Sequence, residues 1–149
     1  METVFISQLK TLFDLAAGKM PLFVPAGKDE HDFFDRYDPD GSANHPEFNE
    51  LRLCSSAKEF LFPLREIAAV FPPSDDNRQE ETAPYAVFGF KACDLRSMAI
   101  LDRVFREEDF LDPGYISRRE AMFILSSDCS NPTQTCCCGL FDGQGYPVE

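Results

Sequence analysis

Two continuous apolar runs separated by a helical pattern constrain the fold of this chain more than any other feature. The runs are YAVFGF (85–90) and AMFILSS (121–127). Between them, apolar residues recur at three- and four-residue steps, which indicates a helix near residues 94–107. Unbroken apolar strands are typical of parallel sheets that are covered on both faces. The pattern predicts an α/β fold in which a small parallel or mixed sheet contains a βαβ unit, with strands near 85–90 and 121–126.

The helix of this unit has signals at both ends. Asp94 is a residue type that favours the N-cap, so the helix is expected to begin there. Arg103 and Arg106 lie near its end, where positive charge suits the helix dipole. A right-handed crossover then makes the two strands parallel, and their C-terminal ends meet at one edge of the sheet. Open α/β sheets bind their ligands at that edge.

Further helices are predicted to flank the sheet. Residues 3–17 have apolar side chains at helical spacing and are followed by Gly18, which is a common residue after a helix end. Residues 55–70 mix apolar and charged side chains, and a helix beginning near Ser55 or Ser56 is expected to break at Pro63.

The segment between these two helices is less regular. Residues 20–25 form a short apolar run that fits a brief or edge strand, because Pro25 cannot donate a hydrogen bond to a neighbouring strand. Residues 27–49 are rich in Asp, Gly, Pro and Asn, and predict an exposed loop. No second ligand type clusters at metal spacing beside His31 or His45, so neither histidine is assigned a role.

Length and charge limit the class of protein. A chain of 149 residues has the common size of one domain, so residues 1–149 are expected to share a single core. Its net charge of −12 repels phosphate backbones and anionic membranes, which argues against nucleic acid as a partner. The N-terminal segment lacks a basic, then apolar, signal peptide, and no later stretch is apolar for about 20 residues. The chain is therefore expected to be cytoplasmic, without membrane insertion.

Cysteines in such a compartment are expected to stay reduced, and the chain has six. Cys93 follows the first predicted strand, and Cys129 follows the second, so both belong to the ligand-binding edge of the sheet. The CCC run (136–138) comes shortly afterwards, and a loop containing Pro132 can fold it back over the same edge.

Four thiolates on roughly tetrahedral corners are the ligands of a [4Fe–4S] cluster. A Cys-x-Cys pair in an extended segment can supply two of them, which favours Cys136 and Cys138 and leaves Cys137 facing away. With Cys93 and Cys129, the sequence predicts one [4Fe–4S] cluster. The backbone N–H groups at the helix start beside Cys93 suit an anionic group.

Three other interpretations of the cysteines remain open. Zinc also accepts four thiolates, although structural zinc sites usually present paired C-x₂₋₄-C turns, which are absent here. Cys93 at a helix start could be a reactive thiol, which leaves the CCC run without a purpose. The cysteines could also be small core residues, and this is the interpretation given to Cys54.

Four segments together carry a family resemblance. They are SAKEFLFPLRE (56–66), VFGFKACDLRSMAILDRVF (87–105), RRE (118–120) and DCSNPTQTCCCG (128–139). In this order they resemble the N-terminal region of the family that comprises the iron–sulfur subunits of anaerobic sulfite reductase and the beta subunits of sulfhydrogenase. Residues Cys93, Cys129, Cys136 and Cys138 match recurring cysteines of that family. The family commonly has an aromatic residue where this chain has Cys137, so Cys137 is not expected to be a ligand.

The resemblance implies an iron–sulfur electron-transfer subunit. Its partners would be a flavin- and nicotinamide-binding reductase and a terminal reductase or hydrogenase, each in a separate subunit. The family continues into a ferredoxin-like region with further cysteine sets, so this chain is expected to be the N-terminal part of a longer protein and to hold one cluster. Asp94, Arg96, Arg118 and Arg119 also match, and they could cap and pair around the helix start or tune the cluster potential.

The predicted function is therefore an electron relay in an anaerobic oxidoreductase, with no bond-making chemistry and no catalytic residue of its own. The alternative is a metal-free or zinc-binding docking domain of such a complex. A nucleotide site is disfavoured because no G-x-G-x-x-G sequence follows the first apolar strand.

Overall fold

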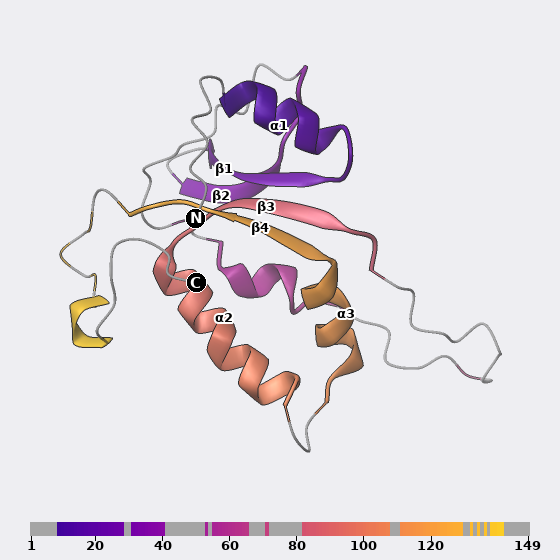
Figure 1. The fold of residues 1–149 in the computed structure, drawn as a ribbon, viewed down its shortest axis with the longest axis vertical. Coiled ribbons are helices and arrows are strands. Elements are labelled where there is room, and N and C mark those ends of the chain that lie inside the picture. Colours follow the sequence, from indigo (N-terminus) through magenta and orange to yellow (C-terminus); the bar gives the residue numbers. More distant parts are fainter. Residues whose placement is uncertain are drawn as a thin grey trace, which may run out of the picture.

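The computed structural model describes residues 9–28, 31–40, 53, 55–65, 71, 82–107, 111–129, 132, 134, 136 and 138–141. The elements, with η for a 3₁₀-helix, are α1 (Leu9–Ala17), β1 (Leu22–Lys28), β2 (His31–Arg36), η1 (Ala57–Phe60), β3 (Tyr85–Phe90), α2 (Ala92–Phe105), α3 (Pro113–Ala121), β4 (Met122–Ser126) and η2 (Cys138–Phe141). Figure 1 shows a layered molecule, with α1 on one side of a sheet and α2 and α3 on the other.

The sheet is mixed and has the strand order β2-β1-β3-β4. The β1–β2 pair is antiparallel, whereas the β1–β3 and β3–β4 pairs are parallel. The predicted α/β class is confirmed, and β3, α2 and β4 occupy the segments predicted for the βαβ unit. The crossover also contains α3, whose sequence PGYISRREA has too few apolar residues for its periodicity to predict a helix.

Both faces of the sheet are covered by a hydrophobic core. The buried members on the α2 and α3 side are Ala57, Leu61, Tyr85, Val87, Phe90, Met98, Tyr115 and Met122. Those of the core that contains α1 are Phe13, Leu22, Val24, Tyr37, Ala86 and Phe88. Because β3 contributes to both cores and is buried along its whole length, its sequence is apolar without alternation.

A bulge at Gly89 redirects the end of β3. The register with β4 shifts between Phe88 and Phe90, and Gly89 has a φ of 98°, which L-residues rarely adopt. In a regular strand Phe90 would point to the same face as Phe88. It instead joins the core on the α2 side, so the bulge also sets the direction in which Lys91 leaves the sheet.

Strand β1 is an inner strand, so the prediction of an edge strand from Pro25 is wrong. β1 pairs with β3 only at Leu22 and Phe23, and this pairing ends before Pro25 is reached. The missing N–H of Pro25 therefore breaks no bond to β3. The proline ring lies against Gly89, where an added Cβ would be 2.6 Å from Pro25 Cγ.

Strand β2 lies within residues 27–49, so the prediction of a loop throughout that segment is also wrong. Its polar residues pair antiparallel with β1, from Phe23 opposite Arg36 to Lys28 opposite His31. Phe34 anchors the strand by edge-on contacts with two other aromatic rings of the core. The hydrogen-bonded pairing with β1 and the packing of Phe34 therefore stabilise β2 as a strand although most of its residues are polar. His45 lies outside the described residues, as does the side chain of His31.

Two predicted helix boundaries are confirmed. The backbone N–H of Gly18 donates to Asp14 O at 3.0 Å just after the end of α1, whereas residues 3–8 lie outside the described part. The expected helix near Ser56 is only the short η1, in which Ser56 Oγ accepts from the Lys58 N–H at 3.3 Å.

Within the described part of the chain, no helix has the length and apolar character needed to cross a bilayer.

Candidate metal centre

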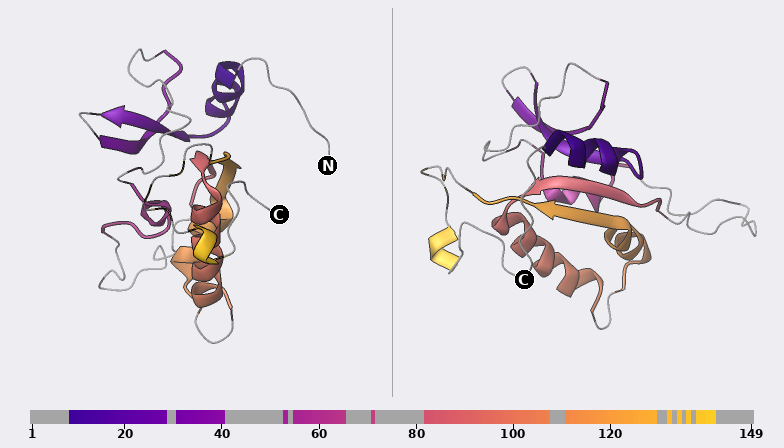
Figure 2. Two further views of the ribbon diagram at one scale, coloured as in Figure 1. Left: turned by 90° about the vertical axis from the view of Figure 1, so that its left-hand side faces the viewer. Right: turned by 45° about the horizontal axis from the view of Figure 1, so that its top comes forward.

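The parallel pairing of β3 and β4 brings the segments that carry Cys93 and Cys129 to one edge of the sheet. The strands pair from Tyr85 opposite Met122 to Phe90 opposite Ser126. Immediately beyond, the Ser127 N–H donates to Phe90 O at 2.9 Å. Figure 1 and both views of Figure 2 place η2, which begins at Cys138, beyond this same end of the sheet, on the side where α2 begins.

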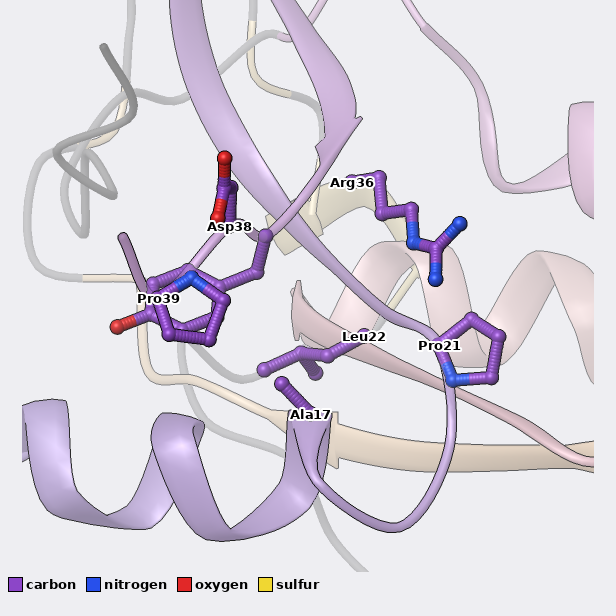
Figure 3. Close-up of a pocket in the computed structure, with 7 residues that line it drawn as sticks. Ala17, Pro21, Leu22, Arg36, Asp38 and Pro39 are labelled. Atoms are coloured by element: carbon purple, nitrogen blue, oxygen red, sulfur yellow. The ribbon is translucent and has the colours of Figure 1, made fainter. Parts of the chain in front are cut away.

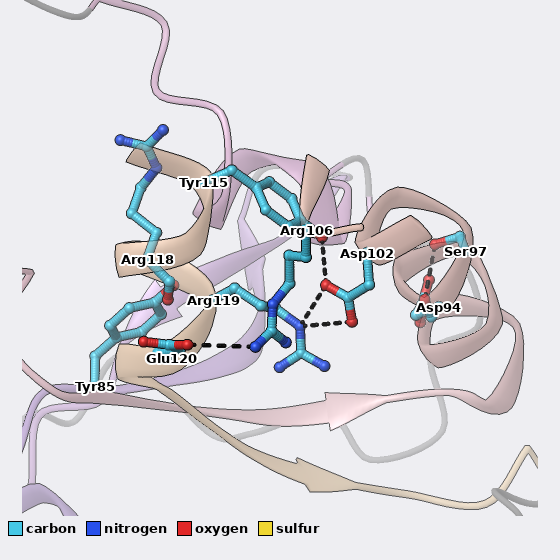
Figure 4. Close-up of polar contacts among 9 residues, drawn as sticks. All are labelled: Tyr85, Asp94, Ser97, Asp102, Arg106, Tyr115, Arg118, Arg119 and Glu120. Carbon is cyan, nitrogen blue, oxygen red and sulfur yellow. Dashed lines mark hydrogen bonds and ion pairs between the residues drawn. The ribbon is translucent and has the colours of Figure 1, made fainter. Parts of the chain in front are cut away.

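The start of α2 differs in detail from the prediction. The N-cap is Lys91, and Asp94 is the third helical residue rather than the cap. From that position its Oδ2 accepts from the Lys91 N–H at 2.9 Å, and Ser97 Oγ donates to Asp94 O at 2.7 Å, as Figure 4 shows for the second pair. An acidic residue at this place satisfies an N-terminal donor as an N-cap would. Cys93 therefore lies within the first turn of α2, not before it.

The Cys93 side chain is exposed at the helix start. Desolvation by the surrounding chain raises the pKa of its thiol, and negative charge on Asp94 and Cys138 raises it further, whereas the backbone N–H groups of Asp94 and Cys93 lower it. A reactive thiol needs a lowered pKa, so these surroundings argue against the interpretation of Cys93 as a nucleophile.

The other predicted ligands are half-buried free cysteines, namely Cys129, Cys136 and Cys138. Cys54 and Cys137 lie outside the described residues. Among the side chains that are described, no group of three or more His, Cys, Asp or Glu is placed to hold a metal ion. The donor chemistry nevertheless fits a thiolate-bound group, because the four described cysteines are free thiols and the segments that carry Cys93 and Cys129 end at one edge of the sheet.

Lys91 is a site residue that the cysteine spacing did not predict. It is buried, with 7% of its surface exposed. Its Nζ donates to Ser127 Oγ and to Asp128 O, each at 2.9 Å. Burial raises the pKa of Asp94, and the backbone hydrogen bond and the charge of Lys91 lower it. The sequence shows a basic residue directly after a fully apolar strand, which does not by itself predict burial.

The two arginines suggested by the resemblance lie away from this edge, on α3. Arg118 Nε donates to Leu61 O at 2.6 Å. Arg119 Nε pairs with Asp102 Oδ1 of α2 at 3.2 Å, and Figure 4 shows this pair together with the neighbouring ion pair of Arg106 and Glu120. Both arginines therefore join α3 to other elements, whereas Arg96 is exposed on α2.

A hollow of about 340 Å³ lies at the opposite end of the sheet (Figure 3). Its lining residues are Ala17, Pro21, Leu22, Arg36, Tyr37, Asp38 and Pro39. Because Leu22 begins a strand that is parallel to β3, this hollow faces away from the end that carries Cys93. It contributes nothing to the candidate centre.

No family model, curated protein or solved structure matches this chain.

Proposed function

We propose that this chain is an iron–sulfur electron-transfer domain that holds one [4Fe–4S] cluster through Cys93, Cys129, Cys136 and Cys138. The observation that carries the proposal is the parallel β3–β4 pair, which ends with Cys93 on one segment and Cys129 on the next. The position of η2, which begins at Cys138 and lies beyond the same end of the sheet, supports it further (Figures 1 and 2).

The chain's own residues would hold the cluster and set its surroundings. When bound, the cluster supplies reversible one-electron transfer, and its potential depends on hydrogen bonds to sulfur, nearby charge and solvent exposure. The thiols supply the ligands. The first turn of α2 offers backbone N–H groups beside Cys93. The half-buried cysteines combine a protected site with an approach for a redox partner.

The resemblance of the sequence motifs extends this proposal to partners. We infer that the chain works in the cytoplasm as part of an anaerobic oxidoreductase, where it passes electrons from a flavin- and nicotinamide-binding reductase to a terminal reductase or hydrogenase, each in a separate subunit. A net charge of −12 suits docking on a basic protein face. The chain would be the N-terminal part of a longer electron-transfer subunit.

The decisive experiment measures iron and acid-labile sulfide in the protein purified without oxygen. We expect about four of each per chain, the composition of one [4Fe–4S] centre, with visible absorbance that bleaches on reduction. The Cys93→Ser variant should lose most of the iron and the colour. Cys54→Ser is the matched control, because Cys54 has no assigned role, and it should retain both.

The opposite result would favour a structural role. Stoichiometric zinc, or a folded colourless protein after attempted cluster reconstitution, would contradict the proposal. The chain would then be better described as a zinc-binding or metal-free docking domain.

A further inference from the structure

Lys91 has an unusual environment for a lysine. Among the described residues, it is the charged side chain that the fold buries, with 7% of its surface exposed. Burying an ammonium group costs several kcal/mol unless hydrogen bonds and opposite charge compensate. Lysine is rarely buried without such compensation. The burial of Lys91 must therefore be explained by the contacts of its ammonium group.

Those contacts join the ends of the two parallel strands. Lys91 belongs to the end of β3, whereas Ser127 and Asp128 continue β4. Lys91 Nζ donates to both, at 2.9 Å in each case. The bond from the Ser127 N–H to Phe90 O ties the same two segments through their backbones. The β3–β4 connection thus extends past the last paired residues and ends at Asp128, directly before Cys129.

The same residue also organises the start of α2. The Lys91 N–H donates to Asp94 Oδ2 at 2.9 Å, across the turn that carries Cys93. One residue therefore contacts the segment before Cys129 through its side chain and the turn around Cys93 through its backbone. Its ammonium group also brings positive charge to an edge that carries the carboxylates of Asp94 and Asp128 and that would carry cysteine thiolates when they bind a metal group.

We propose that Lys91 is a positioning residue for the cysteine site, which holds the segment of Cys129 beside the start of α2 and supplies a buried positive charge to an anionic thiolate-bound group. The proposed supply of positive charge rests on the proposed function. The proposed connection between the two segments concerns the polypeptide alone. The two roles therefore have separate tests.

The connection is tested by amide hydrogen exchange on the full, metal-free chain. We expect Lys91→Met to speed exchange of the Ser127 N–H, which donates to Phe90 O, at least tenfold, while Lys91→Arg restores much of the protection. Lys58→Met removes an exposed lysine from η1 and should leave this exchange unchanged. Equal exchange in the wild type and in Lys91→Met would overturn the connection.

The charge is tested by the reduction potential of the reconstituted protein. Lys91→Met should shift the one-electron equilibrium at least tenfold toward the oxidised form, which lowers the potential by about 59 mV. Lys91→Arg keeps the charge and should stay near the wild type, as should Lys58→Met. An unchanged potential in Lys91→Met would overturn the electrostatic role.

The Lys91→Met variant could fail to fold, and the wild type could take up no iron, and each outcome has its own consequence. If Lys91→Met does not fold, Ser127→Ala replaces it: removing one acceptor should speed the local exchange while leaving the potential unchanged, and unaltered exchange would overturn the connection. If the wild type takes up no iron, the proposed function and the electrostatic role fail together. The exchange experiment still decides whether Lys91 joins the two segments.

Discussion

Gly89 combines two constraints at a single position. Its φ of 98° is costly for any residue with a Cβ, and an added Cβ would lie 2.6 Å from the ring of Pro25 on the neighbouring strand. The bulge turns Phe90 into the core on the α2 side and starts the path of the chain toward Lys91. The geometry of the candidate centre therefore depends on a glycine that carries no side chain.

Substituting Gly89 should destabilise the protein strongly. We expect Gly89→Ala to lower the free energy of unfolding by about 1–3 kcal/mol from backbone strain, with a further loss from contact with Pro25. Urea denaturation followed by circular dichroism measures the change. Gly18→Ala is the matched control, because its Cβ would meet nothing closer than 3.4 Å. A loss no larger than that of Gly18→Ala would contradict the role of Gly89.

The sequence alone indicates part of the role of Gly89. A glycine inside an apolar strand is a recognised sign of a bulge or of close backbone approach. What the sequence could not supply was the neighbour, because Pro25 reaches Gly89 only through the parallel pairing of β1 with β3. For the same reason Pro25 suggested an edge strand, although the pairing that it would disturb already ends at Phe23.

At the scale of elements, a helix or strand could be predicted where the spacing of its apolar residues matches the faces that the fold buries. β3, α2 and β4 were predicted because buried strands and an amphipathic helix have distinct periodicities. β2 and α3 were not, because β2 is mostly polar, α3 has too few apolar residues to show a helical period, and the positions of both depend on partners distant in sequence. In α3, those partners include Asp102, which receives contacts from two residues of the helix.

The contact between α2 and α3 should depend on Tyr115. Its side chain is fully buried, and its hydroxyl donates to Asp102 Oδ1 at 2.8 Å, beside the ion pair with Arg119. Removing a hydrogen bond to a partly buried carboxylate costs about 1.5–3 kcal/mol. We expect Tyr115→Phe to lower the free energy of unfolding by about that amount, measured by urea denaturation.

A matched control exists on the other face of the sheet. The Tyr37 hydroxyl also donates to a carboxylate, Asp14 Oδ1, at 2.8 Å. The Asp14 side chain is 38% exposed, compared with 22% for Asp102, so water can replace the lost donor more readily. Tyr37→Phe should therefore be less harmful than Tyr115→Phe. The reverse order would show that the Asp102 contacts do not hold α3 in place.

At the scale of the whole molecule, one topological inference placed two of the four proposed ligands at one edge of the sheet. Placing two parallel strands side by side was sufficient to bring Cys93 and Cys129 to the same edge. The position of Lys91 was not predictable in this way, because a lysine after a strand is ordinarily solvated. Its burial depends on the acceptors that Ser127 and Asp128 present after β4, and these are specified only once the sheet has formed.

Buried tyrosines on both faces of the sheet should make the whole fold sensitive to alkaline pH. Burial raises the pKa of Tyr85 to about 12, and burial also raises the pKa values of Tyr37 and Tyr115. Between pH 10 and pH 12 the unfolded chain has lost the Tyr85 proton, whereas the folded chain retains it. Unfolding therefore releases protons in this window, and the free energy of unfolding must fall as the pH rises.

We expect a decrease of about 1 kcal/mol per pH unit from Tyr85 alone above pH 10, and no contribution from it below, where both states are protonated. Urea denaturation at several pH values measures the slope. Tyr85→Phe should have a shallower slope above pH 10, although loss of its hydroxyl contacts with Phe60 O and Arg118 O lowers stability at every pH. Because those losses do not titrate, only the slope tests the prediction, and equal slopes in the two proteins would mean that Tyr85 ionises alike in the folded and unfolded chains.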